Sequence, residues 1–121
     1  MAKSRNVFML QQSSREHYRR PSGPLWEPAA DIYRTPEGWK IKFDLAGVKP
    51  DDVEVLISGD KLIVRGVRRD SFITKDWSYH QLEITYSRFE RVIMIPCALS
   101  DATVRSECLD GWLVLHIDCN A

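Results

Sequence analysis

Histidine, cysteine and carboxylate side chains are the residues of this chain that could carry out acid–base, nucleophilic or metal chemistry. The three histidines, His17, His80 and His116, are scattered and lack the close spacing that zinc ligands need. The neighbouring carboxylates Asp51 and Asp52 lie in a segment with the composition of a turn. No set of acid, base and nucleophile is visible, and no glycine-rich phosphate loop precedes a helical segment. We therefore predict that the chain is not an enzyme and binds no metal or cofactor.

The three cysteines, Cys97, Cys108 and Cys119, are evenly spaced without C-x-x-C motifs. An odd number without such spacing suits a reducing compartment better than a secreted disulfide fold. Cys97 and Cys108 fall in strand-like patterns, which predicts that they are small buried hydrophobes. Cys119 is predicted to be an exposed free thiol. These features favour a cytoplasmic protein.

The charge of the chain is balanced overall but uneven along its length. Formal net charge is +0, yet residues 1–20 are net basic and the remainder is net acidic. A basic arm can follow a phosphate backbone or can simply be a solvated tail, and we favour the tail, so no nucleic-acid partner is predicted. The short apolar run of residues 7–10 cannot form a signal-peptide core or span a bilayer. No membrane partner is predicted either.

The 121 residues, of which 44% are hydrophobic, indicate one globular domain with an N-terminal arm. Residues 1–24 end in a Pro-Ser-Gly-Pro linker and are predicted to form a flexible arm. Residues 25–118 are predicted to form the domain, and residues 119–121 a short C-terminal end. The arm carries an apolar cluster, which is a candidate grip on varied hydrophobic surfaces: Val7, Phe8, Met9 and Leu10.

Alternation with a period of two dominates the domain and predicts β-strands. Residues 39–45 alternate apolar and polar side chains without a fault, and residues 53–57, 62–67, 82–86 and 88–95 continue the pattern. Hairpin signals occur at Ser58–Lys61 and at Asp110–Gly111. We predict an all-β, immunoglobulin-like β-sandwich of about seven to eight strands.

Residues 68–81 interrupt this pattern with a long charged segment that nevertheless contains four large apolar side chains. These are Phe72, Ile73, Trp77 and Tyr79. Loops of this length inside compact domains are uncommon and are often functional. Two interpretations remain open: the segment extends and pairs with the sheet edge of another protomer, or it folds back and completes the local core.

Several motifs together resemble the Hsp20/α-crystallin family of small heat-shock proteins, of the bacterial and plant type. Residues 26–33 resemble the opening of the α-crystallin domain, and residues 44–53 resemble the family's D-L-P-G box. Residues 62–66 match the strand that follows that box. Residues 88–91, together with Ile95-Pro96, resemble the G-x-F-x-R…L-P strand. The resemblance covers most of the chain from residue 26 to residue 117.

The sequence departs from the family pattern at several points. Ala46 stands where the family usually has proline, and residues 106–113 keep only Gly111 and Leu113 of the C-terminal signature. The Ile-x-Ile/Val tail motif does not occur after the last strand, which puts a large oligomer in doubt.

The family resemblance also implies how such a chain would bind. It implies an ATP-independent holdase that binds unfolding client proteins and forms a homodimer by strand exchange through residues 68–81. It further implies a hydrophobic client or partner groove between the strands at residues 53–57 and 89–95. The predicted groove residues are Val53, Val55, Ile57, Phe89, Ile93 and Ile95. The alternative is an interaction module, or a partner subunit that joins other small heat-shock proteins and modulates their assembly.

Overall fold

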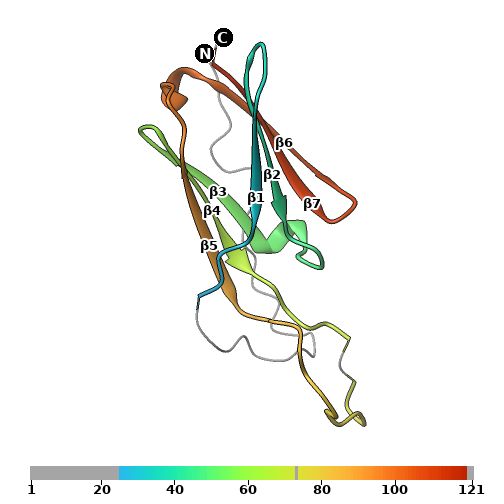
Figure 1. Ribbon diagram of the computed structural model, residues 1–121. Helices are drawn as coiled ribbons and strands as arrows, with labels where there is room; N and C mark the ends of the chain where they lie inside the picture. The colour runs from blue at the N-terminus through green and yellow to red at the C-terminus, as the bar shows by residue number, and fades with distance from the viewer. Residues whose placement is uncertain (1–24, 73, 120–121) are drawn as a thin grey trace.

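The computed structural model describes residues 25–72 and 74–119, so residues 1–24, 73 and 120–121 lie outside the described part. In the described part, seven strands and two short 3-10 helices follow one another: β1 (Ala30–Arg34), β2 (Gly38–Asp44), η1 (Pro50–Asp52), β3 (Val53–Ser58), β4 (Lys61–Val67), β5 (Arg88–Met94), η2 (Leu99–Asp101), β6 (Thr103–Leu109) and β7 (Trp112–Asp118). A four-stranded sheet, β1-β2-β7-β6, lies against a three-stranded sheet, β3-β4-β5 (Figure 1). Every strand pair is antiparallel. The predicted all-β sandwich is confirmed.

Strand β2 shows how the sequence alternation becomes a half-buried strand. Ile41, Phe43 and the following Leu45 are buried, while Lys40 and Asp44 are exposed on the opposite side. Neighbours on both sides, β1 and β7, satisfy the backbone hydrogen bonds of β2. Because β2 is central in its sheet, its apolar side chains have neighbouring strands on both sides to pack against.

The two predicted hairpins are also present. Strands β3 and β4 pair directly across the turn from Ser58 to Lys61. Strands β6 and β7 pair across Asp110 and Gly111, whose φ angles of 53° and 86° are both positive. Positive φ at both central residues is the requirement of a type I′ turn, which matches the right-handed twist of the flanking strands.

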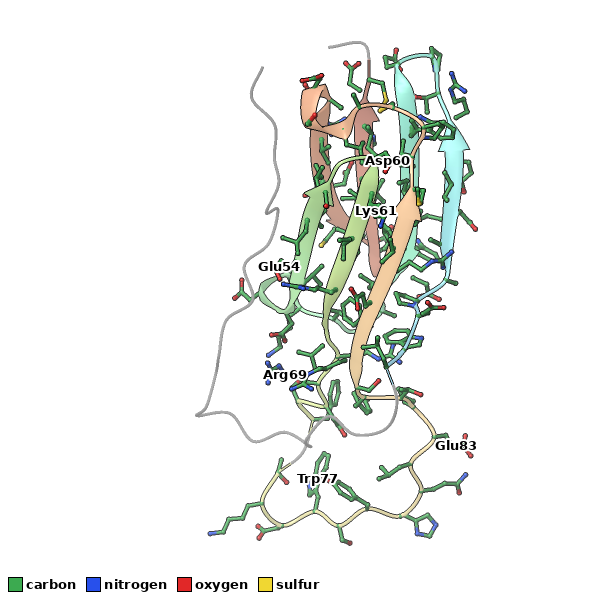
Figure 2. All side chains as sticks on the ribbon, turned by 90° about the vertical axis from the view of Figure 1, so that its left-hand side faces the viewer. Glu54, Asp60, Lys61, Arg69, Trp77 and Glu83 are labelled. Atoms are coloured by element: carbon green, nitrogen blue, oxygen red, sulfur yellow. A yellow bond between two sulfur atoms is a disulfide. The ribbon has the colours of Figure 1, made fainter. Side chains whose placement is uncertain are left out.

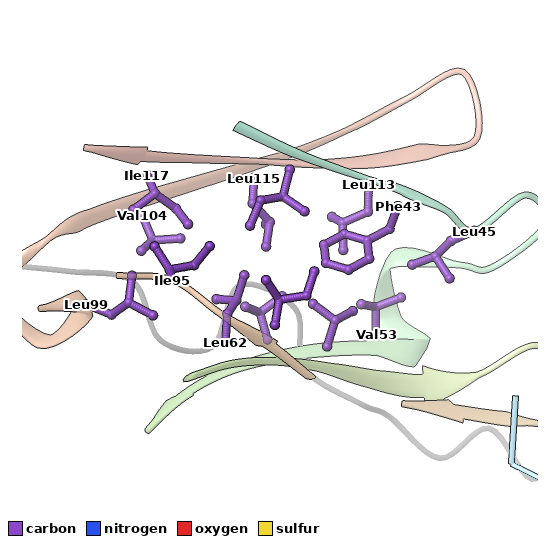
Figure 3. Packing of buried hydrophobic residues seen from close by; sticks show 14 of the residues in the cluster. Phe43, Leu45, Val53, Leu62, Ile95, Leu99, Val104, Leu113, Leu115 and Ile117 are labelled. Atoms are coloured by element: carbon purple, nitrogen blue, oxygen red, sulfur yellow. The ribbon is translucent and has the colours of Figure 1, made fainter. Parts of the chain in front are cut away.

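The hydrophobic core fills the space between the two sheets (Figure 3). Both sheets contribute, with Phe43, Leu113 and Leu115 from one and Val55, Leu62 and Phe89 from the other, all with at most 1% of their surface exposed. Burying a side chain of this size contributes about 1.5–3 kcal/mol. The core therefore holds the two sheets face to face and gives the other segments a fixed frame.

The prediction of a strand at residues 82–86 is wrong. Leu82 and Ile84 alternate with polar residues, yet this segment has no strand structure and both side chains are exposed. The chain leaves the sandwich after β4 and returns at β5, so the segment has no neighbouring strand and no sheet face to cover (Figure 1). Alternation alone does not make a strand when no backbone partner is within reach.

Candidate protein-binding surfaces

The connection between β4 and β5, residues 68–87, projects from one end of the sandwich and presents apolar side chains to solvent. We call it the projecting loop. Phe72 is 77% exposed and Trp77 is 62% exposed, and Tyr79 is also more than half exposed. Figure 2 shows Trp77 in the part of the loop that lies away from both sheets. Ile73, the fourth predicted member of this group, lies outside the described residues. The interpretation in which these aromatics fold back to complete the local core is wrong for the described members.

The predicted groove between β3 and β5 is not formed, because β4 lies between these two strands. The side chains of Val53, Val55, Phe89, Ile93 and Ile95 are each at most 5% exposed. Ile57 is partly buried and packs against the same cluster. The alternation correctly placed these residues on one face, but that face is the core itself. The predicted groove location is therefore wrong.

A small hollow does exist near the edge of β3 that faces away from β4. It has a volume of about 150 Å³ and lies between the end of β2, the start of β3 and the β6–β7 hairpin. Its walls include Leu45, Val48, Val53, Cys108, Trp112 and Leu113. Only Val53 belongs to the predicted groove. The other residues form two groups, one at the end of β2 and one in the β6–β7 hairpin, and local patterns could not show that these distant groups meet.

The base of the projecting loop is held by two consecutive arginines. Arg68 donates from Nε to the carbonyl oxygen of Thr85 at 2.8 Å and from Nη1 to that of Ala46 at 3.2 Å. Arg69 donates from Nε to a carboxylate oxygen of Asp52 at 3.2 Å. The sequence predicted only a long charged segment from residue 68 onward, and it did not predict these partners.

The Asp52–Arg69 pair is largely shielded from water. Asp52 is buried, and its side chain and that of Arg69 are 8% and 13% exposed. Burial raises the pKa of Asp52 above its ordinary value of 3.8, and the Arg69 charge and hydrogen bond offset only part of that increase. The composition of this segment predicted a turn, and η1 forms there, but the composition did not predict that Asp52, the last residue of η1, is buried.

The cysteines differ from prediction in two ways. Cys97 and Cys119 form a disulfide with their Cα atoms 6.3 Å apart, so Cys119 is not a free thiol. Cys108 is free and exposed rather than buried. Partial desolvation raises the pKa of its thiol, which makes it a weak nucleophile at neutral pH. The pairing removes the cysteine-based argument for a reducing compartment, and the cytoplasmic location stays a prediction.

The histidines and carboxylates do not assemble into a reactive centre in the part of the chain that is described. His80 is exposed in the projecting loop, and Nε2 of His116 lies 2.8 Å from a carboxylate oxygen of Glu107 on the outer face of the four-stranded sheet. Among the described residues, no group of three or more potential ligands is placed to hold a metal ion. No helix in this part of the chain is long and apolar enough to cross a bilayer. His17 and the predicted arm residues Val7, Phe8, Met9 and Leu10 lie outside the described residues.

These features define a class of protein: a two-sheet antiparallel sandwich with an apolar projecting loop between its fourth and fifth strands. Comparison with known sequences gives the family. The profile described as "Hsp20/alpha crystallin family" matches residues 31–121. The chain therefore belongs to the Hsp20/α-crystallin family, whose members are small heat-shock chaperones, and the resemblance noted from its motifs is confirmed.

Curated relatives share this part of the chain at modest identity. "Small heat shock protein C2" of Rickettsia felis is 28% identical over 90 residues, which cover 74% of this chain and 57% of that protein. "Spore protein SP21" of Stigmatella aurantiaca is 29% identical over 98 residues, which cover 81% of this chain and 58% of that protein. The chain thus spans less than three fifths of the length of these relatives.

Solved structures share the fold. Heat shock protein 16.0 from Schizosaccharomyces pombe superposes with a TM-score of 0.70 at 20% identity, covering 78% of this chain and 88% of that one. A small heat-shock protein from Xylella fastidiosa gives a TM-score of 0.66 at 25% identity, covering 81% of this chain and 90% of that one. The architecture is therefore that of experimentally solved small heat-shock proteins.

Proposed function

We propose that this chain is an ATP-independent holdase that binds partly unfolded proteins and keeps them from aggregating. The observation that carries the proposal is the projecting loop, which exposes aromatic side chains on a chain of the Hsp20/α-crystallin family. Exposed aromatic surface is costly in water and is relieved by binding another apolar surface. Unfolding clients offer such surface, and their transient burial requires no nucleotide.

We further propose that a second copy of the chain covers part of this surface. Residues 68–81 would extend to the edge of the partner's four-stranded sheet and form a homodimer by strand exchange. Strand β1 is an edge strand of that sheet, and its Ile32 and Tyr33 side chains are exposed. An open edge of this kind is a template for an added strand.

Clients would use more than one weak contact. The hollow beside Cys108 and Trp112 is the candidate apolar groove, in place of the one predicted between β3 and β5. The cluster at residues 7–10 is the candidate grip on the arm. Several weak contacts acting together provide avidity that none provides alone.

The test is light scattering from a heat-labile protein that is warmed with and without this chain in the absence of ATP. Suppression at a near-stoichiometric ratio is expected. A variant in which Phe72, Trp77 and Tyr79 are all changed to serine should lose most of the suppression. The matched control changes Val92 and Met94 to serine, because these are exposed apolar residues on the outer face of β5, away from the loop.

Two results would count against the proposal. Unchanged scattering in the presence of a folded wild-type chain rejects autonomous chaperoning and favours the partner-subunit alternative, which co-assembly with other small heat-shock proteins would then test. Equal loss of activity in the loop variant and in the β5 control rejects a specific role for the loop.

A further inference from the structure

The base of the projecting loop is where three segments that are distant in sequence come together. These are Trp26 at the start of the described chain, the turn at Ala46 and Gly47, and the two ends of the loop itself. The backbone joins the loop ends, because the N–H of Arg68 donates to the carbonyl oxygen of Ser87 at 3.0 Å. One side chain, that of Arg68, contacts all three segments.

The guanidinium of Arg68 uses both its hydrogen-bond donors and its flat faces. Nε and Nη1 donate to the carbonyl oxygens of Thr85 and Ala46. The guanidinium carbon lies 4.2 Å from the centre of the Trp26 ring and 5.9 Å from that of the Tyr86 ring. A planar cation with several fixed donors can make these contacts at once, whereas the compact ammonium of lysine cannot stack and bridge in the same way.

The turn at Ala46 and Gly47 lies within contact distance of the Arg68 side chain. Gly47 has a φ of +82°, and a Cβ built there would lie 3.8 Å from Cδ of Arg68. The positive φ places this residue in a backbone region that favours glycine. The Ala46 carbonyl in this turn accepts the hydrogen bond from the Arg68 guanidinium, so the turn is part of the same assembly.

Trp26 connects this assembly to the sandwich. The backbone N–H of Trp26 donates to the carbonyl oxygen of Arg88 at 2.9 Å, and the backbone carbonyl of Trp26 accepts from the N–H of Glu90 at 3.0 Å. Its ring meets the buried Phe89 edge-on, with ring centres 5.7 Å apart. Trp26 is thus fixed to the first residues of β5 while its ring also contacts Arg68.

We propose that Arg68 is a positioning residue that sets the direction of the projecting loop and couples the loop to the segment at Trp26. A partner that moves the loop would therefore disturb the point at which the N-terminal residues join the domain. This inference rests on the proposed strand exchange through residues 68–81 and deepens it, since it names the residue that orients the loop for pairing with a second copy.

The test compares Arg68→Lys with Arg65→Lys in the full chain. The control lies three residues earlier, on β4, and replaces the arginine of an exposed cross-strand ion pair, Arg65 Nε to Glu54 Oε1 at 3.0 Å, with a lysine of the same charge. Amide hydrogen exchange is measured at a dilution that favours monomer, and the homodimer dissociation constant is measured by analytical ultracentrifugation.

Arg68→Lys is expected to speed exchange by about tenfold at the backbone amides of residues 26 and 68, which donate to the carbonyl oxygens of Arg88 and Ser87, while exchange in β2 and β7 stays as in the wild type. The dissociation constant should rise by about tenfold, the scale expected from losing a stacked, hydrogen-bonded cation. Arg65→Lys should leave both quantities within about twofold of the wild type, as is usual for exposed pairs of this kind.

Unchanged hydrogen exchange at the backbone amides of residues 26 and 68 in Arg68→Lys would overturn the coupling. Faster exchange there with an unchanged dissociation constant would overturn the positioning role. Hydrogen exchange is measured on the monomer, so it decides the coupling even when the wild-type chain does not dimerise. Failure of the wild type to dimerise would instead reject the proposed strand exchange between two copies. Failure of the coupling and failure of strand exchange are therefore distinguishable.

Discussion

The sandwich and the projecting loop contain the same kinds of apolar side chain in opposite surroundings. Phe43 in β2 has none of its surface exposed, whereas Phe72 in the loop is mostly in solvent. Leu62 in β4 and Leu82 in the loop form a similar pair. The sandwich residues are buried because a second sheet covers them. The loop residues have no such cover within the described chain, and a surface of that kind is where a partner gains most by binding.

The largest expected effect comes from opening the sandwich core. Phe43→Ala should lower the free energy of unfolding by about 3–5 kcal/mol, because it removes a fully buried ring and leaves a cavity. Urea titration followed by circular dichroism measures the change. A loss below about 1 kcal/mol would contradict the packing shown in Figure 3.

The disulfide tests how the two sheets are tied at one end. Cys97 follows β5 and Cys119 follows β7, with a separation of 22 residues between them. Reduction, or Cys97→Ser, should lower the free energy of unfolding by about 3 kcal/mol, because the closed loop restricts the unfolded chain. Thermal unfolding with and without a dithiol reductant measures this, and Cys108→Ser is the control because its thiol is free. An equal response in the Cys97→Ser and Cys108→Ser variants would contradict the pairing.

The buried pair beneath the loop base predicts a pH dependence. Burial raises the pKa of Asp52, so the carboxyl of Asp52 binds its proton more tightly in the folded state than in the unfolded state. Its contribution to stability is fully present below the unfolded value near 3.8 and is lost as pH rises through the raised folded pKa.

Asp52→Asn removes that titration while leaving a side chain that can still accept a hydrogen bond from Arg69. The free energy of unfolding is measured by urea titration from about pH 3 to about pH 7, the range in which a carboxyl with a raised pKa titrates. As pH rises, the free energy of unfolding of Asp52→Asn should increase relative to that of the wild type. A constant difference across this range would show that the carboxyl does not titrate differently in the two states.

The smallest expected effect on stability comes from the loop. Phe72→Ala and Leu82→Ala should each change the free energy of unfolding by less than about 0.5 kcal/mol, since exposed side chains contribute little to folding. Urea titration at low concentration, where monomer prevails, measures this against Phe43→Ala and Leu62→Ala. A loss approaching that of the core variants would mean that the loop packs against its own domain, and the comparison between the two regions would fail.

The sequence determined every strand of the sandwich except β1, which no alternation signal marked. Period-two alternation located β2, β3, β4 and β5, and Asp110–Gly111 located the β6–β7 hairpin, because these signals depend only on local geometry. The same alternation at Leu82 and Ile84 was misleading, since a strand also needs a backbone partner that the sequence cannot supply. The order of the motifs along the chain was specific enough by itself to indicate the family.

Only the tertiary structure decided which faces meet. Pairing β4 between β3 and β5 turned the predicted groove into core, and closure of the sandwich brought Cys97 to Cys119. Likewise, Arg68 reaches Trp26 and Ala46 because strand pairing returns distant segments to one end of the sandwich. Local patterns report which side chains avoid water, whereas contacts between distant segments depend on strand order, which is set by the packing of the whole chain.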